Sequence, residues 1–381
     1  MAHHWEPSRN LAKQTYLQVD SRPHETAWYR YCLYPPRTTL EPVGDQWKKM
    51  RKVMAFNVIN PARLSWLLHK RTQEADNLAK LIYNQCINHE NLHGGVINLI
   101  LALRQYTGNM IRRMMFNRRH FRKGRKDGGP GYEEEQHVES LFTVLMHLNS
   151  FILLDYVPWL KPLDLEGYEK IVSEALRIVN GYHDPLVNER IKEWRQGKIN
   201  EPQDLFDSFI LAKDFNGQPA LSAEEIKAQI TIRLVEETDI PKLNYICPRE
   251  AFQLHPIAPF NVLHVSNADT TVAGYFIPKG SRVLISCRGL DPKVWEEPLE
   301  FKPERHLKDE WGSGGVELTE NELRGLGSAV TIMLFARLIQ GFTWEVPPNV
   351  TKIDLFESED EAKPLHALVK PRLSPALYTR F

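Results

Sequence analysis

The sequence contains few cysteines and spaces them widely. Four occur in 381 residues, namely Cys32, Cys86, Cys247 and Cys287. No two of them have the C-x-x-C spacing of a zinc site or a redox pair. We therefore expect free intracellular thiols and no disulfide framework.

A net charge and a long apolar run are also missing. The 48 Lys and Arg residues balance the 48 Asp and Glu residues, so no global field draws the chain to nucleic acid or to anionic lipid. The first residues have neither a basic n-region nor an apolar h-region, and no segment has the uninterrupted apolar length of a spanning helix. We expect no membrane anchor in this chain and a cytoplasmic location for it.

Three familiar catalytic motifs are absent as well. The sequence has no G-x-S-x-G elbow, no P-loop and no G-x-G-x-x-G turn. These absences remove the clearest signatures of hydrolases, of P-loop nucleotide binding and of dinucleotide binding.

Periodic apolar residues predict a mainly α protein with a small β subdomain. Asn60 can cap a helix that Pro61 begins, and Ser222 with Glu225 has the spacing of a capping box. Apolar residues recur every three or four positions in several stretches, which predict helices over 61–82, 99–114, 133–154, 164–195, 204–211 and 320–340. After about residue 258, short β-prone runs separated by turns predict strands over 262–265, 270–276 and 282–286.

An H-E-x-x-H pattern is formed by His89, Glu90 and His93. On a continuous helix this spacing binds zinc and places a general base beside it. Here Gly94 and Gly95 follow at once and no third ligand stands out, which favours a fraying helix end over a zinc protease.

A basic stretch between residues 112 and 126 could contact phosphates. It contains Arg118, Arg119 and six further arginines or lysines, and His120 with Phe121 interrupts it. A glycine-rich turn and three glutamates follow, which indicates a solvated loop with compensating charge. A non-catalytic binding protein that uses this loop stays as an alternative, although we expect no nucleic-acid partner.

Several short segments, weak singly, gain weight from their order along the chain. Trp47 and Arg51 lie one helical turn apart, so both can address the same anionic group. The further segments are 117–131, 239–245, 255–261, 273–280 and 303–306. With them the chain resembles the cytochrome P-450 superfamily, and within it the plant family that N-hydroxylates amino acids to aldoximes.

The resemblance implies roles for particular residues. Trp47, Arg51 and His264 would bind haem, the first two at its propionates. Glu250 and Arg305 would belong to a buried ion-pair cluster. The substrate side would be lined by Pro259, Phe260 and Asn261. The family uses a haem-thiolate iron to activate dioxygen, and an NADPH-dependent reductase supplies its electrons.

The sequence departs from this family in elements that the chemistry needs. No cysteine follows Cys287, and only six residues, 325–330, stand where the family places its cysteine loop. The central oxygen-activating helix is cut short, because residues 232–235 lead almost directly to 239–241. Gln253 replaces the arginine that would pair with Glu250. We therefore expect no catalytic residue and no metal ligand in this chain, and no activity.

The expected organisation is a divergent segment over 1–43 and an incomplete cytochrome P-450-like domain over 44–381. Its helical part would span about 44–257, and its part with strands and a late helix about 258–381. The lineage implies the endoplasmic-reticulum membrane, an amino-acid substrate and a reductase partner. The sequence does not show which amino acid.

Overall fold

The computed structural model describes most of the chain. The described residues are 44–57, 61–87, 95–125, 128–149, 167–214, 216–238, 254, 264–266, 268–272, 274–283, 297–302, 326–348, 350 and 365–380. The predicted N-terminal segment, 1–43, lies outside them.

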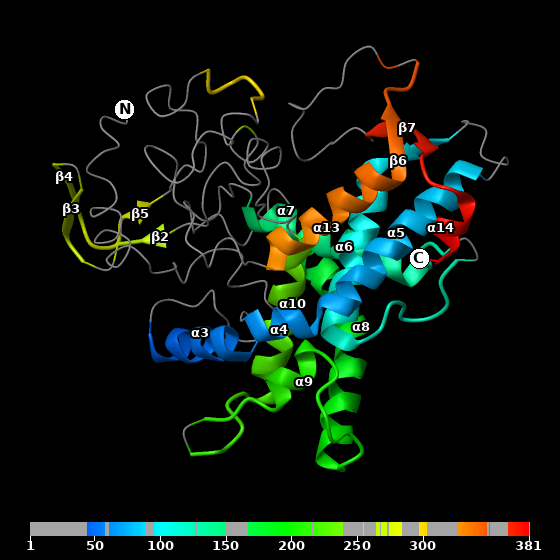
Figure 1. The fold of residues 1–381 in the computed structure, drawn as a ribbon. Coiled ribbons are helices and arrows are strands. Elements are labelled where there is room, and N and C mark those ends of the chain that lie inside the picture. The colour runs from blue at the N-terminus through cyan, green and yellow to red at the C-terminus, as the bar shows by residue number, and fades with distance from the viewer. Residues whose placement is uncertain are drawn as a thin grey trace.

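Helices dominate the described part, as the apolar periodicity predicts. Their bounds are α3 Asp45–Asn57, α4 Pro61–Trp66, α5 Leu68–Ile87, α6 Leu99–Phe116, α7 Tyr132–Asn149, α8 Tyr168–Arg195, α9 Leu205–Ile210, α10 Ala223–Thr238, α13 Leu326–Gly341 and α14 Pro375–Arg380. Helix α6 packs against α5, α7, α9 and α10, while α7 packs against α8 and α13 against α5 (Figure 1). The mainly α class is confirmed.

The two ends of α6 show why this helix starts and stops where it does. The side chain of Asn98 accepts a hydrogen bond from the Leu101 N–H at 3.2 Å, which satisfies one of the free donors of the first turn. At the other end Asn117 adopts a left-handed conformation with φ 53°, and its N–H donates to the Arg113 carbonyl. An asparagine tolerates this conformation better than most residues, so the helix ends as the sequence predicts.

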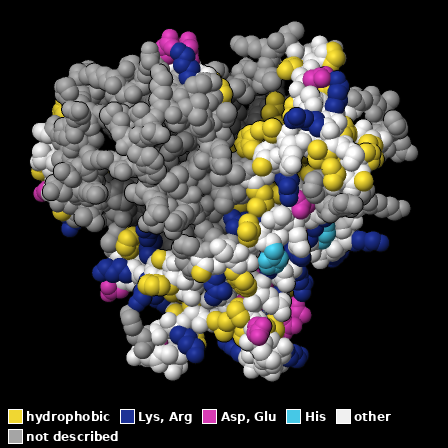
Figure 2. Space-filling model, viewed as in Figure 1, with side chains coloured by type: hydrophobic (Ala, Val, Ile, Leu, Met, Phe, Trp, Pro, Cys, Tyr) yellow, Lys and Arg dark blue, Asp and Glu magenta, His cyan; other side chains and the backbone are white. Residues whose placement is uncertain are grey.

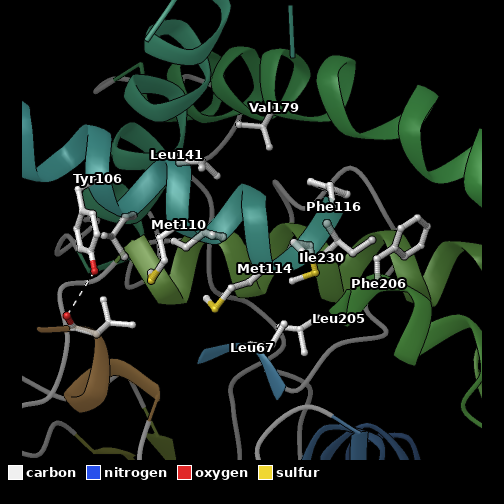
Figure 3. Packing of buried hydrophobic residues seen from close by; sticks show 14 of the residues in the cluster. Leu67, Tyr106, Met110, Met114, Phe116, Leu141, Val179, Leu205, Phe206 and Ile230 are labelled. Atoms are coloured by element: carbon white, nitrogen blue, oxygen red, sulfur yellow. Dashed lines mark hydrogen bonds between the residues drawn. The ribbon is translucent and has the colours of Figure 1, made fainter. Parts of the chain in front are cut away.

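One apolar cluster joins these helices. Tyr106, Met110 and Met114 lie four residues apart on α6 and are all buried. Figure 3 shows them with Leu141 of α7, Val179 of α8 and residues of α9 and α10. Burial of each such side chain contributes about 1.5–3 kcal/mol, so this cluster is the main source of stability.

The strands form small antiparallel sheets. Their bounds are β1 Val96–Asn98, β2 His264–Val265, β3 Thr270–Val272, β4 Tyr275–Ile277, β5 Arg282–Val283, β6 Phe342–Glu345 and β7 His366–Pro371. Strand β2 pairs with β5 and β3 with β4, inside the region where the sequence predicts strands. The third sheet has the order β1-β7-β6 and lies beside α5 (Figure 1). Strand β1 does not follow from the sequence pattern, because its partner lies near the other end of the chain.

Candidate functional site

Helix α3 carries the two residues expected at the haem propionates. Met50, Val53 and Met54 recur on its inner face and are buried, which fixes the rotation of the helix. Trp47 and Arg51 lie one helical turn apart, on a face of α3 other than this buried one. The Arg51 guanidinium carbon lies 5.2 Å from the centre of the Trp47 ring. The two side chains therefore meet, while their role at an anionic group stays a prediction.

Arg51 is exposed, and in the described part of the chain no carboxylate forms a salt bridge with it. A guanidinium held on an aromatic ring and open to solvent is well suited to an anionic group. This pair could therefore hold a carboxylate of a cofactor.

Glu225 holds α3 in place, a role that the sequence pattern did not show. Its carboxylate accepts hydrogen bonds from Gln46 Nε2 at 2.7 Å and from Lys49 Nζ at 2.8 Å. It also closes the predicted capping box, because it accepts from the Ser222 N–H at 2.7 Å. Burial alone would raise the pKa of Glu225, but these donors lower it. The start of α10 is thus bonded to α3.

The other predicted site residues are described only in part or not at all. His264 lies in β2, where it pairs with Val283 of β5, but its side chain is outside what the structure describes. The ion-pair residues and the substrate residues lie outside the described residues too, namely Glu250, Arg305, Pro259, Phe260 and Asn261. Their roles remain predictions.

Cys86 is the one cysteine within the described residues. It lies on α5, where its Sγ donates to the Val369 carbonyl at 3.5 Å. Burial raises the pKa of this thiol to about 11. The thiol therefore bonds α5 to β7, and α5 is not the element where the family places its cysteine loop.

Helix α13 is held where the family's cysteine loop would precede it. The Tyr106 hydroxyl donates to the Val330 carbonyl at 3.5 Å (Figure 3), and Arg337 Nε donates to Asp76 Oδ1 at 2.6 Å. These contacts bind α13 directly to α6 and α5. The residues expected at the haem propionates, Trp47 and Arg51, are present on α3, whereas residues 288–325 before α13 contain no cysteine to serve as the ligand of a haem iron.

The two alternative sites gain no support from the geometry. His89, Glu90 and His93 lie outside the described residues, and α5 ends at Ile87. Within the described ranges no three His, Cys, Asp or Glu residues are grouped so as to hold a metal ion.

The basic loop is compensated, as predicted, but it is less solvated than the sequence indicates. Arg119 bonds to Glu74 and Arg122 to Glu133, each at 3.2 Å, and further pairs join Arg118 to Glu189 and Arg125 to Glu135. Arg112 is fully buried. Figure 2 shows Lys and Arg side chains interleaved with acidic and apolar ones over the described part of this face. Most of these cations therefore have partners within the protein.

Comparison with known proteins decides the family. The cytochrome P-450 family model matches residues 10–239 and 232–314. The chain belongs to the cytochrome P-450 family.

The relatives are named amino-acid N-monooxygenases. A phenylalanine N-monooxygenase of Arabidopsis thaliana is 49% identical over 402 residues, which cover 89% of this chain and 75% of the relative. A tryptophan N-monooxygenase of Prunus mume is 46% identical and covers 98% of this chain and 81% of the relative. For a tyrosine N-monooxygenase of Sorghum bicolor the identity is 44% and the coverages are 98% and 77%. The predicted family membership is confirmed.

Solved structures agree on the fold. A zebra fish cytochrome P-450 solved with abiraterone has a TM-score of 0.65 at 17% identity and covers 92% of this chain and 88% of that chain. A second zebra fish structure, with progesterone, has a TM-score of 0.67, also at 17% identity, with coverages of 95% and 92%. The cytochrome P-450 fold is therefore present in spite of the departures in sequence.

The comparisons also bear on the internal departures. The match with the phenylalanine N-monooxygenase is 402 positions long, more than the 381 residues of this chain, so it includes positions at which only the relative has a residue. The family match comes in two segments that overlap at residues 232–239, where the sequence indicates a shortened central helix. None of the helices that the structure describes is both long and apolar enough to span a bilayer.

Proposed function

We propose that this chain descends from haem-dependent monooxygenases that N-hydroxylate an amino acid to an aldoxime. The relatives support this lineage, because they are named for phenylalanine, tryptophan and tyrosine as well as for valine and isoleucine. The substrate class is therefore an amino acid with an aromatic or branched side chain. The lineage further implies a reductase partner that is supplied by NADPH and a site at the endoplasmic-reticulum membrane.

We also propose that the chain itself does not carry out this reaction. The single observation behind this is the missing cysteine, since none follows Cys287 and α13 is reached without a ligand loop. In haem-thiolate enzymes the sulfur pushes electron density toward the iron and favours O–O cleavage. The Trp47 and Arg51 pair can hold a carboxylate of the group but cannot replace that ligand.

Optical spectroscopy tests both parts. Purified protein is supplied with haem, reduced and exposed to carbon monoxide, and we expect no Soret band at the long wavelength that marks thiolate ligation. Amino-acid turnover is measured with a reductase in the same preparation, and we expect no oxime above background.

A matched pair of variants sharpens this test. Arg51→Gln should weaken any residual haem binding that the α3 pair supports, while Lys48→Gln on the same helix should not. A thiolate-type band from the unmodified chain would contradict the proposed inactivity. Replacing Cys247 and Cys287 by serine in turn would then identify the ligand.

A further inference from the structure

Arg112 is the centre of a buried polar cluster that the proposed function does not use. It projects from α6, and its side chain is completely buried. Its guanidinium donates to Asn109 Oδ1 at 2.5 Å, to the Arg119 carbonyl at 3.3 Å and to His137 Nδ1 at 3.2 Å. These bonds join α6 to the following loop and to α7.

A pair of histidines continues this chain of hydrogen bonds to α8. His137 Nε2 lies 2.7 Å from His183 Nε2, and both side chains are buried. A guanidinium can only donate, so Nδ1 of His137 must accept and its proton must lie on Nε2. That proton is donated to Nε2 of His183, which places the proton of His183 on Nδ1. Among the described protein atoms this Nδ1 has no hydrogen-bond partner.

The arrangement leaves no place for another proton. A proton added to His137 Nδ1 would point at the Arg112 guanidinium, and one added to His183 Nε2 would point at the N–H of His137. Each would break a hydrogen bond and place a second positive charge in an interior that contains Arg112. The cluster is therefore stable only while both imidazoles are neutral.

Phe121 separates this pair from solvent. Its ring stacks on Tyr182 at 4.7 Å between centres, meets the His137 ring edge-on at 4.9 Å and lies 5.4 Å from the Arg112 guanidinium carbon. The loop that carries it is closed by Glu134, whose carboxylate accepts from the Phe121 N–H at 2.5 Å and from the Gly131 N–H at 2.8 Å. Lifting this loop would remove the Phe121 ring from His137 and so admit water to the pair.

The charged groups around the pair come from each neighbouring element. Arg112 faces it from α6, and Glu134 on α7 binds the loop and His120 rather than an imidazole of the pair. Tyr182 on α8 is held by Gln136, and Lys227 on α10 lies 3.9 Å from Asp184 of α8. The positive charge of Arg112 acts on both imidazoles, and His183 acts in addition on His137.

We infer that residues 117–125, which follow α6, are an acid-released latch, which Arg112, His137 and His183 hold closed while the two histidines are neutral and which opens when they gain protons. Desolvation by burial lowers the pKa of His183 to about 3, and burial, His183 and Arg112 hold the pKa of His137 well below its ordinary value of 6.5. The open loop would restore ordinary values. Opening is therefore favoured as the pH falls below about 6.5.

Hydrogen exchange measured by mass spectrometry on the full chain tests this inference. Protection factors for peptides within 117–125 are compared with those of α5 between pH 7.5 and 5.0, after correction for the intrinsic rate at each pH. Below pH 6.5 we expect protection of the loop to fall by about tenfold per pH unit for each histidine, or about a hundredfold for the pair. Protection of α5 should stay constant.

Variants separate the latch from ordinary acid unfolding. In the double variant His137→Gln with His183→Gln, protection of the loop should no longer depend on pH. His147→Gln is the matched control, because His147 lies on α7 outside the cluster and bonds to the Thr143 carbonyl. It should keep the full pH response. If the double variant does not fold, His183→Gln alone should show about half of the logarithmic response, and Phe121→Ala should show low loop protection already at pH 7.5.

Three results would overturn the latch. They are constant protection of 117–125 down to pH 5.0, an equal fall in α5, and an unchanged pH response in the histidine variant that folds.

Discussion

Two parts of the helical core bury polar side chains, and they differ in whether those side chains have hydrogen-bond partners among the described residues. Where α6, α7 and α8 meet, Arg112, His137 and His183 form a chain of hydrogen bonds, and Glu134 accepts from the Phe121 and Gly131 N–H groups. Where α10 packs near α6, Gln229 is fully buried, and neither its Oε1 nor its Nε2 has a hydrogen-bond partner among the described residues. Gln105 of α6 also has an unpartnered Oε1.

The two parts also differ in their place in the family match. Gln229 lies three residues before position 232, where the second segment of that match begins. The α6–α7–α8 junction lies wholly within the first segment. A buried amide without a partner costs about 1–3 kcal/mol, so the core at Gln229 is expected to be less favourable than the partnered junction.

The largest loss of stability should come from removing Arg112, which lies at the centre of the hydrogen-bonded junction of α6, α7 and α8. Arg112→Met removes the donor to Asn109 and His137 and leaves Glu134 without its nearest buried cation. We expect the free energy of unfolding to fall by about 3–5 kcal/mol, measured by urea denaturation.

Arg118→Met is the matched control for that variant. Arg118 is half exposed and lies 3.9 Å from Glu189, so its loss should cost less than about 1 kcal/mol. Equal losses for the two variants would show that burial does not distinguish them.

A pH series on Glu134 should give the next largest effect. Burial alone would raise the pKa of this carboxyl, but His120, the two backbone N–H donors and Arg112 lower it to about 2. The folded-state pKa is thus below the ordinary 4.5, so the contribution is complete above pH 4.5 and is lost as the pH falls through 2. Its size is about 3 kcal/mol at neutral pH.

The difference in unfolding free energy between wild type and Glu134→Gln isolates this contribution from that of the histidines. We expect the difference to be constant above pH 5 and to shrink toward pH 2. A difference that does not change with pH would mean that the Glu134 carboxylate is not stabilised in the folded state.

The smallest expected effect is an increase in stability. It tests the region where the buried Gln229 amide has no hydrogen-bond partner among the described residues. Gln229→Leu removes a buried amide without partners, so we expect the free energy of unfolding to rise by about 1–2 kcal/mol, measured by denaturant unfolding. Gln340→Leu, an exposed change on α13, should stay within about 0.5 kcal/mol of wild type. A loss of stability in Gln229→Leu would show that the amide is bonded in solution.

The sequence predicted features that depend on neighbours along the chain. The end of α6 at Asn117, the capping box of Ser222 and Glu225 and the meeting of Trp47 with Arg51 all involve residues within one helical turn. Such patterns depend on residues that are close in the sequence, so periodicity and capping rules predict them.

Features that depend on distant residues were not predicted. Lys49 meets Glu225 across 176 positions, and a run of arginines gives no sign that Arg112 alone would be buried. The family resemblance supplied what local pattern could not, namely the expected haem role of α3. That role and the roles of Glu250, Arg305 and the substrate residues stay predictions.

The β1-β7-β6 sheet has a consequence for how the fold tolerates changes in the length of the chain between β1 and β7. Val96 of β1 pairs with Leu368 of β7, so two strands that are far apart in the sequence are hydrogen-bonded to each other beside α5. The entropy of closing such a large loop changes by only about 0.6 kcal/mol for each doubling of its length. Shortening the intervening chain by some tens of residues therefore hardly alters the entropic cost of pairing β1 with β7, so the fold tolerates such a change of length.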